Sequence, residues 1–307
     1  MIPEEFSRNV VAAWGVDGAE WLAELPATLR NLAHDWNLQV GTPYDLSYHY
    51  VTAVVCEDGT PAVLKLGVPT GTSLAKEAAA LAVFEGRGTV RLLRADFGRG
   101  ALLLERITPG GRVRDLVSHR DWQATSAAVE IIRRLHVPPP RGCSMPAVID
   151  QAQAFADYQA VHGAKGPLPL ELVVRAGGLM QELCDSATDR VVLHGDLHHD
   201  NILRGTREAW LAIDPHGLVG DSGYEVGALL YNPDPGNRDD TLTALVPARV
   251  EQLADELAMP VDRVVAWGFV KAVLSGVWSV EGWSSVADSS PISRALDVAR
   301  LLHPRLR

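Results

Sequence analysis

The sequence contains few cysteines, and these lie far apart. Its 307 residues include three, Cys56, Cys143 and Cys184, with no CxxC pair among them. An odd number at such wide spacing argues against a framework of disulfide bonds and against a structural zinc site. Isolated thiols are typical of a reducing compartment, so we expect a cytoplasmic protein.

Basic residues are also scarce relative to acidic ones. The chain has 28 Lys and Arg against 38 Asp and Glu, which gives a formal net charge of -10. Proteins that bind nucleic acid gather positive charge opposite the phosphates, so nucleic acid is not an expected partner. An acidic surface suits a cationic small molecule, although it also serves solubility alone.

Long apolar runs are missing as well. No apolar run reaches the roughly 20 residues that a helix needs to span a membrane. The opening residues MIPEEFSRNV lack the basic-then-apolar pattern of a signal peptide. We therefore expect no membrane partner.

The first hundred residues alternate between helical and β patterns. Apolar residues recur at helical spacing over residues 1–40, with interruptions near Gly15 and Pro26. Two β-branched runs then flank Glu57–Thr60 and predict a hairpin. Residues 73–86 predict a helix with Ser73 as N-cap. Two more apolar runs follow, on either side of the turn FGRG.

The rest of the chain is mostly helical in pattern. A short β patch interrupts it around Val191–Leu193, Ile202–Leu203 and Trp210–Ile213. The predicted fold class is therefore α+β, with a β-rich unit over residues 1–105, a Pro/Gly-containing linker over 106–111 and a larger helical unit over 112–307.

One segment, VVLHGDLHHDNIL at 191–203, crowds polar residues between two apolar runs. Asp196 and Asn201 lie five apart on a loop between short strands, and Asp214 follows at the end of the next apolar run. One carboxylate that accepts a hydroxyl proton, with an amide and a second carboxylate as Mg²⁺ ligands, is what phosphoryl transfer needs. The alternative is a solvated polar turn, where Asp, Asn and His are common.

A lysine within an apolar strand gives independent support. Lys65 lies in AVLKL, where an ammonium group is costly without a partner, and Glu77 follows twelve residues later on the predicted helix. A strand lysine paired with a helix glutamate is the kinase arrangement for holding the α- and β-phosphates. The alternative is an edge-strand lysine that faces water.

The three histidines of the polar segment raise the possibility of a metal site. His194 and His198 are four apart, a spacing that suits metal binding on a helix but not on a loop after a strand. We expect His194 and His198 to brace the loop by hydrogen bonds, and His199 to be exposed.

These motifs, in this order, resemble the aminoglycoside phosphotransferase family, relatives of protein kinases. The residues that carry the resemblance are HGDLHHDN, the later IDP, and the upstream Lys65 and Glu77. The flanking stretches GTPAVLKL, WLAIDPHGLVGD and YNPDPGNRDD are most similar to streptomycin kinases, a group that includes hydroxyurea phosphotransferases. The resemblance covers the whole chain and implies a two-lobed, protein-kinase-like fold.

The resemblance implies a role for each motif residue. Asp196 would be the catalytic base, with Asn201 and Asp214 as magnesium ligands. Lys65 would hold the phosphates of ATP, and Glu77 would be its ion-pair partner.

The resemblance also places a hinge at LLLERI. There the Glu105 carbonyl and the Ile107 amide would bind the adenine edge, with Leu104 lining the pocket. Leu104 reads equally well as strand core.

The sequence departs from the protein-kinase pattern in several places. It has no GxGxxG before Lys65 and no GxxxxGK, Gly195 replaces the arginine of HRD, and IDP stands where DFG would. We find no APE-like segment either. These departures argue against a protein kinase more than against a small-molecule kinase.

Acidic residues of the helical unit are candidates for binding a cationic acceptor, because a buried cation must be paired. Asp221 also has a second interpretation, since the matching kinase position stabilises the catalytic loop. Asp239 and Asp240 read equally well as helix-capping acids. The candidates are Asp221, Glu225, Asp234, Asp239, Asp240 and Glu281, with Trp278 and Trp283 as aromatic neighbours or core.

The resemblance implies an ATP- and Mg²⁺-dependent O-phosphotransferase that confers antibiotic resistance by phosphorylating streptomycin on its streptidine ring. We expect the protein to be a monomer. Two alternatives stay open: a kinase of another acceptor, such as hydroxyurea or a metabolite alcohol, and a nucleotide-binding pseudokinase.

Overall fold

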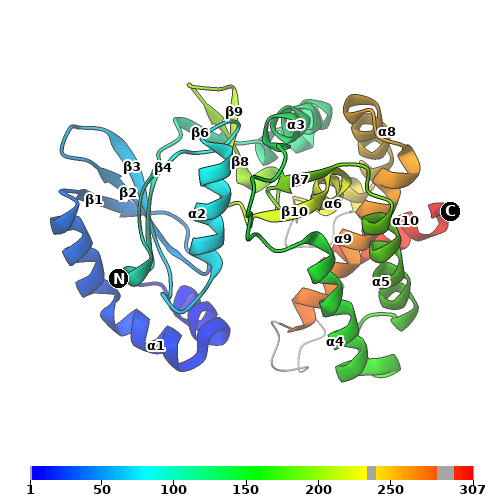
Figure 1. The fold of residues 1–307 in the computed structure, drawn as a ribbon, viewed down its shortest axis with the longest axis horizontal. Helices are drawn as coiled ribbons and strands as arrows, with labels where there is room; N and C mark the ends of the chain where they lie inside the picture. The colour runs from blue at the N-terminus through cyan, green and yellow to red at the C-terminus, as the bar shows by residue number, and fades with distance from the viewer. Residues whose placement is uncertain (1, 234–239, 282–293, 307) are drawn as a thin grey trace. The chain divides into compact units, whose positions relative to one another are not determined.

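The computed structural model describes residues 2–233, 240–281 and 294–306 (Figure 1). The chain divides into two compact units, residues 1–108 and 109–307. The linker predicted at 106–111 spans this division.

The first unit is built on a five-stranded antiparallel sheet with the strand order β1-β2-β3-β5-β4. Its elements are α1 (Glu4–Asp35), β1 (Gln39–Pro43), β2 (Tyr50–Val55), β3 (Pro61–Leu66), α2 (Ser73–Phe84), β4 (Leu92–Asp96), a 3₁₀ turn (Phe97–Arg99) and β5 (Ala101–Glu105).

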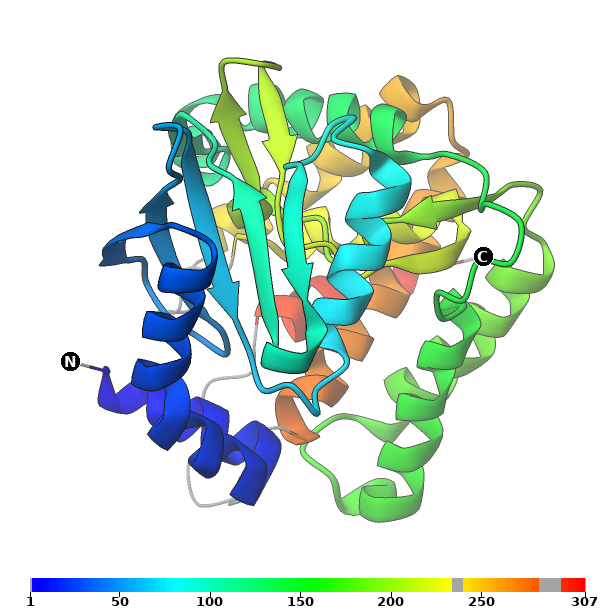
Figure 2. The ribbon, with the colours of Figure 1, turned by 60° about the vertical axis from the view of Figure 1, so that its left-hand side comes forward.

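Alternate side chains of this sheet pack in different layers. Leu64 and Leu103 join residues of α1, among them Phe6 and Leu25, in one apolar cluster. Lys65 points to the other face, since successive strand residues alternate, and there its ammonium meets Glu77 of α2. Helices α1 and α2 therefore cover the sheet on separate sides (Figure 2).

The observed ends of these elements refine the sequence-based prediction. The N-terminal helix ends at Asp35 and β1 begins at Gln39, so the helical pattern over residues 1–40 included the first two residues of this strand. Gly15 kinks α1 with φ 58° and ψ −126°, as its interruption of the pattern indicated. The prediction that Ser73 is the N-cap of α2 is wrong, since Thr72 holds that position and Ser73 is the first helical residue, with its hydroxyl 3.0 Å from Nε2 of His49.

The second unit combines two small sheets with a helical core. The strands are β6 (Pro109–Arg112), β7 (Arg190–Leu193), β8 (Ile202–Gly205), β9 (Trp210–Ala212) and β10 (Leu218–Asp221), paired as β10-β7 and β6-β8-β9. The α-helices are α3 (Arg114–Leu135), α4 (Gln153–His162), α5 (Leu170–Asp185), α6 (Val226–Tyr231), α7 (Asp240–Thr243), α8 (Val246–Leu257), α9 (Val261–Glu281) and α10 (Arg294–Leu302). The 3₁₀ turns are Val148–Ala152, Gly163–Lys165, His199–Asn201 (η4), Ser222–Glu225 (η5) and His303–Arg305.

Two of these strands were not predicted. Strand β6 has the sequence PGGR, which lacks any apolar alternation and was interpreted as part of the linker. Strand β10, LVGD, is only four residues long. Both are strands because of their partners: β6 pairs with β8, and β10 pairs with β7 along its whole length.

Helix α9 is the core of the second unit, with α4, α5, α6, α8 and α10 packed against it. Within the described ranges it is also the one helix whose length and apolar composition would allow it to cross a membrane, over Val261–Val280. The expectation that no stretch is long and apolar enough to span a membrane is therefore wrong, by the criteria of length and composition. Since 72% of that window is buried inside the protein, core packing accounts for its apolar character.

Gly100, between the 3₁₀ turn and β5, offers a test of the first unit. Its φ is +58°, and an added Cβ would lie 2.2 Å from the backbone oxygen of Gly67. Gly59, in the β2–β3 hairpin, has φ +82° but open space around it. We expect Gly100→Ala to lower the free energy of unfolding by clearly more than the roughly 1–2 kcal/mol that positive φ alone costs in Gly59→Ala. Urea denaturation of both variants measures this, and equal losses would show that the contact with Gly67 is unimportant.

Candidate active site

The polar loop predicted to carry catalysis begins where β7 ends. Residues 194–198 lead from β7 into η4, and β8 follows at once. Buried Val192 and Leu193 anchor one side of the loop, and buried Ile202 anchors the other. The loop is therefore a short polar excursion between two fixed strands, as the apolar flanks of HGDLHHDN indicated.

The amide groups at the start of the loop are held by one carboxylate. The amides of His194 and Gly195 donate to Oε2 and Oε1 of Glu225, at 2.7 and 3.0 Å. The Asp196 amide donates to Nδ1 of His194 at 3.3 Å. Three consecutive N–H groups thus have side-chain acceptors instead of strand partners, which fixes the backbone that presents Asp196.

The carbonyl groups of the same three residues are also bound. The amides of His216 and Gly217 donate to the His194 carbonyl at 2.8 and 3.2 Å. Lys271 Nζ lies 3.2 Å from the Gly195 carbonyl, and Asn201 Nδ2 lies 3.0 Å from that of Asp196. Every backbone polar group of residues 194–196 therefore has a partner.

The ring of His194 confirms the predicted bracing role. Its Nε2 donates to the Ile213 carbonyl at 2.8 Å while its Nδ1 accepts from the Asp196 amide. Burial lowers the pKa of His194 to about 4. The imidazole is therefore neutral near pH 7, as this one-donor, one-acceptor arrangement requires.

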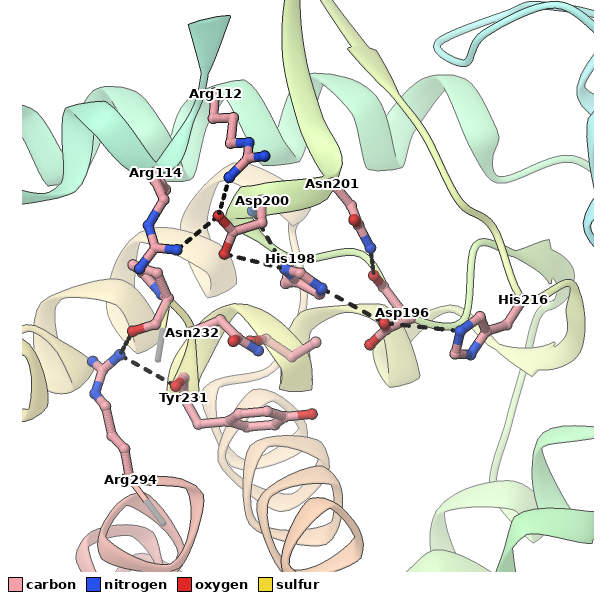
Figure 3. Close-up of polar contacts among 12 residues, drawn as sticks. Arg112, Arg114, Asp196, His198, Asp200, Asn201, His216, Tyr231, Asn232 and Arg294 are labelled. Atoms are coloured by element: carbon pink, nitrogen blue, oxygen red, sulfur yellow. Dashed lines mark hydrogen bonds and ion pairs between the residues drawn. The ribbon is translucent and has the colours of Figure 1, made fainter. Parts of the chain in front are cut away.

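The Asp196 carboxylate lies between two imidazoles (Figure 3). His198 Nε2 and His216 Nε2 approach its Oδ2 at 3.6 and 3.9 Å, from opposite sides. Burial acts to raise the pKa of Asp196, but His198, His216 and Lys271 outweigh it, so the pKa lies well below the usual range. With 31% of the side chain exposed, Asp196 is an ionised, reachable proton acceptor.

Asn201 and Asp214 are brought together by the β8–β9 hairpin. Ile202 pairs with Ala212, and the Ile213 amide donates to the Asn201 carbonyl at 2.9 Å. Asp214 follows directly, with a left-handed φ of 62° that is rare for a non-glycine residue and is typical of functional sites.

The donor set of this pair suits Mg²⁺. Because Asn201 Nδ2 is used by the Asp196 carbonyl, Oδ1 is the atom that remains for a metal. In the described ranges no three His, Cys, Asp or Glu side chains form a metal-binding group. One amide and one carboxylate oxygen, completed by phosphate and water, are a normal magnesium set.

The other polar residues of the loop, at positions 198–200, differ in burial and in their contacts. His198 accepts from the Asp200 amide through Nδ1 and so braces the loop as predicted. The prediction that His199 is exposed is wrong, since its relative exposure is 0%. Oδ1 of Asp200 forms ion pairs with Nη1 of Arg114 at 2.9 Å and with Nη1 of Arg112 at 3.9 Å (Figure 3). These contacts hold η4 against the start of α3.

In the first unit, Lys65 and Glu77 form a buried ion pair with an N–O distance of 2.6 Å. Their side chains are 6% and 3% exposed, so the alternative of a water-facing lysine does not hold. Lys65 pairs in register with Leu102, and Leu104 lies two residues along β5 on the same face. Glu105 ends β5, and Ile107 follows it in the segment before β6.

Two of the predicted acceptor ligands do not fit their surroundings. Asp221 is 4% exposed, and its carboxylate accepts from Trp267 Nε1, the Gly223 amide and the Arg263 guanidinium. Glu225 is 1% exposed, and both of its oxygens bind loop amides. We therefore correct both: neither carboxylate is available to an acceptor, and the support of the catalytic loop attributed to Asp221 comes from Glu225.

The remaining acceptor candidates lie at or beyond the edges of the described ranges. Asp234, Asp239 and Trp283 fall outside them, as do the side chains of Asp240 and Glu281. Trp278 is described: its ring centroid lies 5.4 Å from Lys271 Nζ.

Sequence reasoning did not single out Lys271, Arg263 or His216. The first two lie eight residues apart on α9, with Trp267 midway, so they share one helix face. That spacing of polar groups within an apolar helix was the available signal.

Comparison with known proteins decides the family. Residues 36–282 match the model of the aminoglycoside/hydroxyurea antibiotic resistance kinases. The chain belongs to this family. It is 31% identical to a streptomycin 6-kinase of Streptomyces glaucescens, over 96% of this chain and 95% of the relative. It is 33% identical to a hydroxyurea phosphotransferase of Kitasatospora aureofaciens, over 91% of this chain and 80% of the relative.

A solved structure supports the kinase-like fold. The choline kinase LicA of Streptococcus pneumoniae superposes with a TM-score of 0.62 at 12% identity, over 92% of this chain and 98% of that one. The predicted protein-kinase-like fold and the predicted family are thus confirmed, and the chain is a phosphotransferase of that family.

The Lys65–Glu77 pair predicts opposite effects of single and double substitution. Glu77→Leu should remove the carboxylate that binds this buried ammonium and cost about 3–5 kcal/mol of unfolding free energy. Lys65→Met combined with Glu77→Leu should recover most of that stability, because two apolar residues replace the two charges. Chemical denaturation checks the stability, and a double variant as unstable as the single one would contradict the argument.

Glu225 predicts a specific dependence of stability on pH. Burial raises its pKa from 4.5 to about 7, against the opposing effect of the two amides. Between these pH values the folded protein holds a proton that the unfolded chain releases, so this contribution is full below pH 4.5 and is lost as the pH rises through 7. Relative to Glu225→Gln, the wild type should lose on the order of 3 kcal/mol over that range. Urea titrations at several pH values measure the difference, and parallel curves would contradict the shifted pKa.

Proposed function

We propose that this protein is an ATP- and Mg²⁺-dependent kinase that phosphorylates streptomycin on a hydroxyl of its streptidine ring, as a monomer in the cytoplasm. The observation that carries the proposal is the loop geometry around Asp196, together with 31% identity to a streptomycin 6-kinase over nearly the full length of both chains. Three free cysteines are compatible with the cytoplasm.

The chemistry follows from the side chains. The acceptor hydroxyl attacks the γ-phosphorus, the bond from that phosphorus to the bridging oxygen breaks, and ADP leaves. Asp196 orients the hydroxyl and accepts its proton, for which its lowered pKa keeps it ionised at neutral pH. Asn201 and Asp214 would hold Mg²⁺, which neutralises charge on the phosphates when bound.

Lys65 supplies the second contact with the nucleotide. Glu77 holds its ammonium in place, and the ammonium contacts the α- and β-phosphates. Leu104 lines the adenine pocket, and the Glu105 carbonyl and Ile107 amide bind the adenine edge. This assignment rests on the family resemblance and on the register that places Leu104 on the face of Lys65.

A second acceptor is supported by its own observation. A hydroxyurea phosphotransferase is 33% identical to this chain, and the same family model covers both substrates in its description. Hydroxyurea also offers a hydroxyl, so the proton-accepting chemistry of Asp196 would be unchanged.

A coupled ADP-release assay with Mg·ATP tests the proposal. The acceptors are streptomycin, spectinomycin, kanamycin, hydroxyurea and none, and mass spectrometry locates the added phosphoryl group. Asp196→Asn should lower streptomycin-dependent kcat roughly 100- to 10,000-fold. Asp189→Asn, the same change on an exposed residue before β7, is the control and should keep full activity.

Turnover with hydroxyurea alone would replace streptomycin as the acceptor. Full activity of Asp196→Asn would show that the base has been assigned to the wrong residue. ATP binding without turnover of any acceptor would favour the pseudokinase alternative.

A further inference from the structure

Lys271 is a buried cation that the proposed chemistry does not use. It lies in α9 with 1% of its surface exposed. Its Nζ donates to the Gly195 carbonyl at 3.2 Å and to the Tyr224 hydroxyl at 3.1 Å. The same ammonium lies 4.3 Å from the ring centroid of Tyr224 and 5.4 Å from that of Trp278.

Burying this ammonium costs stability. Among the described residues the direct contacts of its ammonium are a carbonyl, a hydroxyl and two aromatic faces, while the charges of Asp196 and Glu225 act on it without an ion-pair contact. A methionine would fill similar volume without the desolvation cost. A lysine at this position is therefore explained better by function than by stability.

The contacts of Lys271 indicate what that function is. Gly195 precedes the catalytic Asp196, and its two backbone groups bind opposite charges: its amide binds Glu225 and its carbonyl binds Lys271. Gly195 has φ +87°, so this peptide is set in a conformation that other residues rarely adopt. Rotation of the peptide between residues 195 and 196 would move the Asp196 carboxylate.

Helix α9 brings this contact from a distant part of the chain. Arg263, Trp267 and Lys271 are spaced by four residues, so they lie on one face of the helix. The first two bind Asp221, at the start of η5, and the third reaches the catalytic loop. The face is thus a continuous polar row that ties the core helix to the loop.

We propose that Lys271 is a positioning residue for phosphoryl transfer, which fixes the Gly195 carbonyl and places a positive charge behind Asp196. The proposal rests on the kinase function above and deepens it. With 1% of its surface exposed, Lys271 acts on turnover through the geometry and charge of the loop.

The test separates positioning from folding. Lys271→Met should lower kcat roughly 10- to 100-fold, because a small misplacement of the base is costly, with the KM for ATP unchanged. Its thermal midpoint should equal or exceed that of the wild type. Lys271→Arg, which keeps a charged donor but is larger, should retain more activity than Met at a lower midpoint.

Val273→Ala is the matched control on the same helix. Val273 is buried and lies about 200° round the helix from Lys271. We expect it to lower the thermal midpoint without lowering kcat. Full kcat in Lys271→Met, or a loss that only follows the fraction unfolded, would overturn the proposal.

A pH profile gives a readout that a purely structural role would not move. Glu225 faces the His194 and Gly195 amides, His136 at the end of α3 at 4.0 Å, and the charges of Lys271 and Asp196. Burial raises the pKa of Glu225, and Lys271 opposes that rise. Without Lys271, Glu225 should protonate at higher pH, so the acidic limb of kcat should move upward in Lys271→Met. An unmoved limb would contradict the charge effect.

Hydrogen exchange tests the contact between Lys271 and the Gly195 carbonyl even if no acceptor is found. The peptide covering residues 191–203 should exchange faster in Lys271→Met than in the wild type or in Val273→Ala. If this peptide exchanges faster in Lys271→Met but the wild type does not phosphorylate streptomycin, the contact is supported and the streptomycin assignment is refuted. Unchanged exchange would refute the contact itself, whatever the acceptor.

Discussion

The hydrogen bonds from the His194 and Gly195 amides to the buried Glu225 carboxylate are the constraint on which the active site depends. Strand β7 ends at Leu193, so these two amides have left the sheet and are buried without strand partners. An unpaired buried amide costs about 1–3 kcal/mol, and two would favour a different path for the loop. Glu225 accepts both hydrogen bonds and so fixes the backbone from which the Asp196 side chain extends. Burial of the Glu225 carboxylate is itself unfavourable, and for this reason its pKa is raised.

The same principle organises the rest of the chemistry: charged groups are buried only where a second element supplies the partner. Lys65 of β3 has Glu77 of α2, and Asp221 has Arg263 and Trp267 of α9. Each contact joins two different elements, so each depends on the packing of helices and sheets that surrounds it. This is why the apolar core of each unit contributes to catalysis without touching the substrate.

The sequence predicted those features whose cause is local. The hairpins around Glu57–Thr60 and Phe97–Gly100, the helix ending near Gly86 and strand β7 follow from alternation and turn residues. Asn201 and Asp214 could be associated because one hairpin joins them. The Gly-rich β6 and the four-residue β10 were missed because only their partners make them strands. His199 and the carboxylates of Asp221 and Glu225 were misjudged for a related reason, since burial and hydrogen bonding depend on distant helices that no local pattern reveals.

The burial of those two carboxylates bears on the choice of acceptor. The groups to which we assign phosphoryl transfer are a carboxylate, an amide, a second carboxylate and a lysine, and such groups recognise phosphate, metal and any hydroxyl alike. None of them distinguishes streptomycin from hydroxyurea, so discrimination must come from side chains that touch the rest of the acceptor. Asp221 and Glu225 are excluded from that role because every oxygen that could pair with a cation is already bound. A polycationic acceptor therefore has to be recognised by acidic groups that lie outside the supports of the catalytic loop, and changes in acceptor within the family can occur without disturbing the position of Asp196.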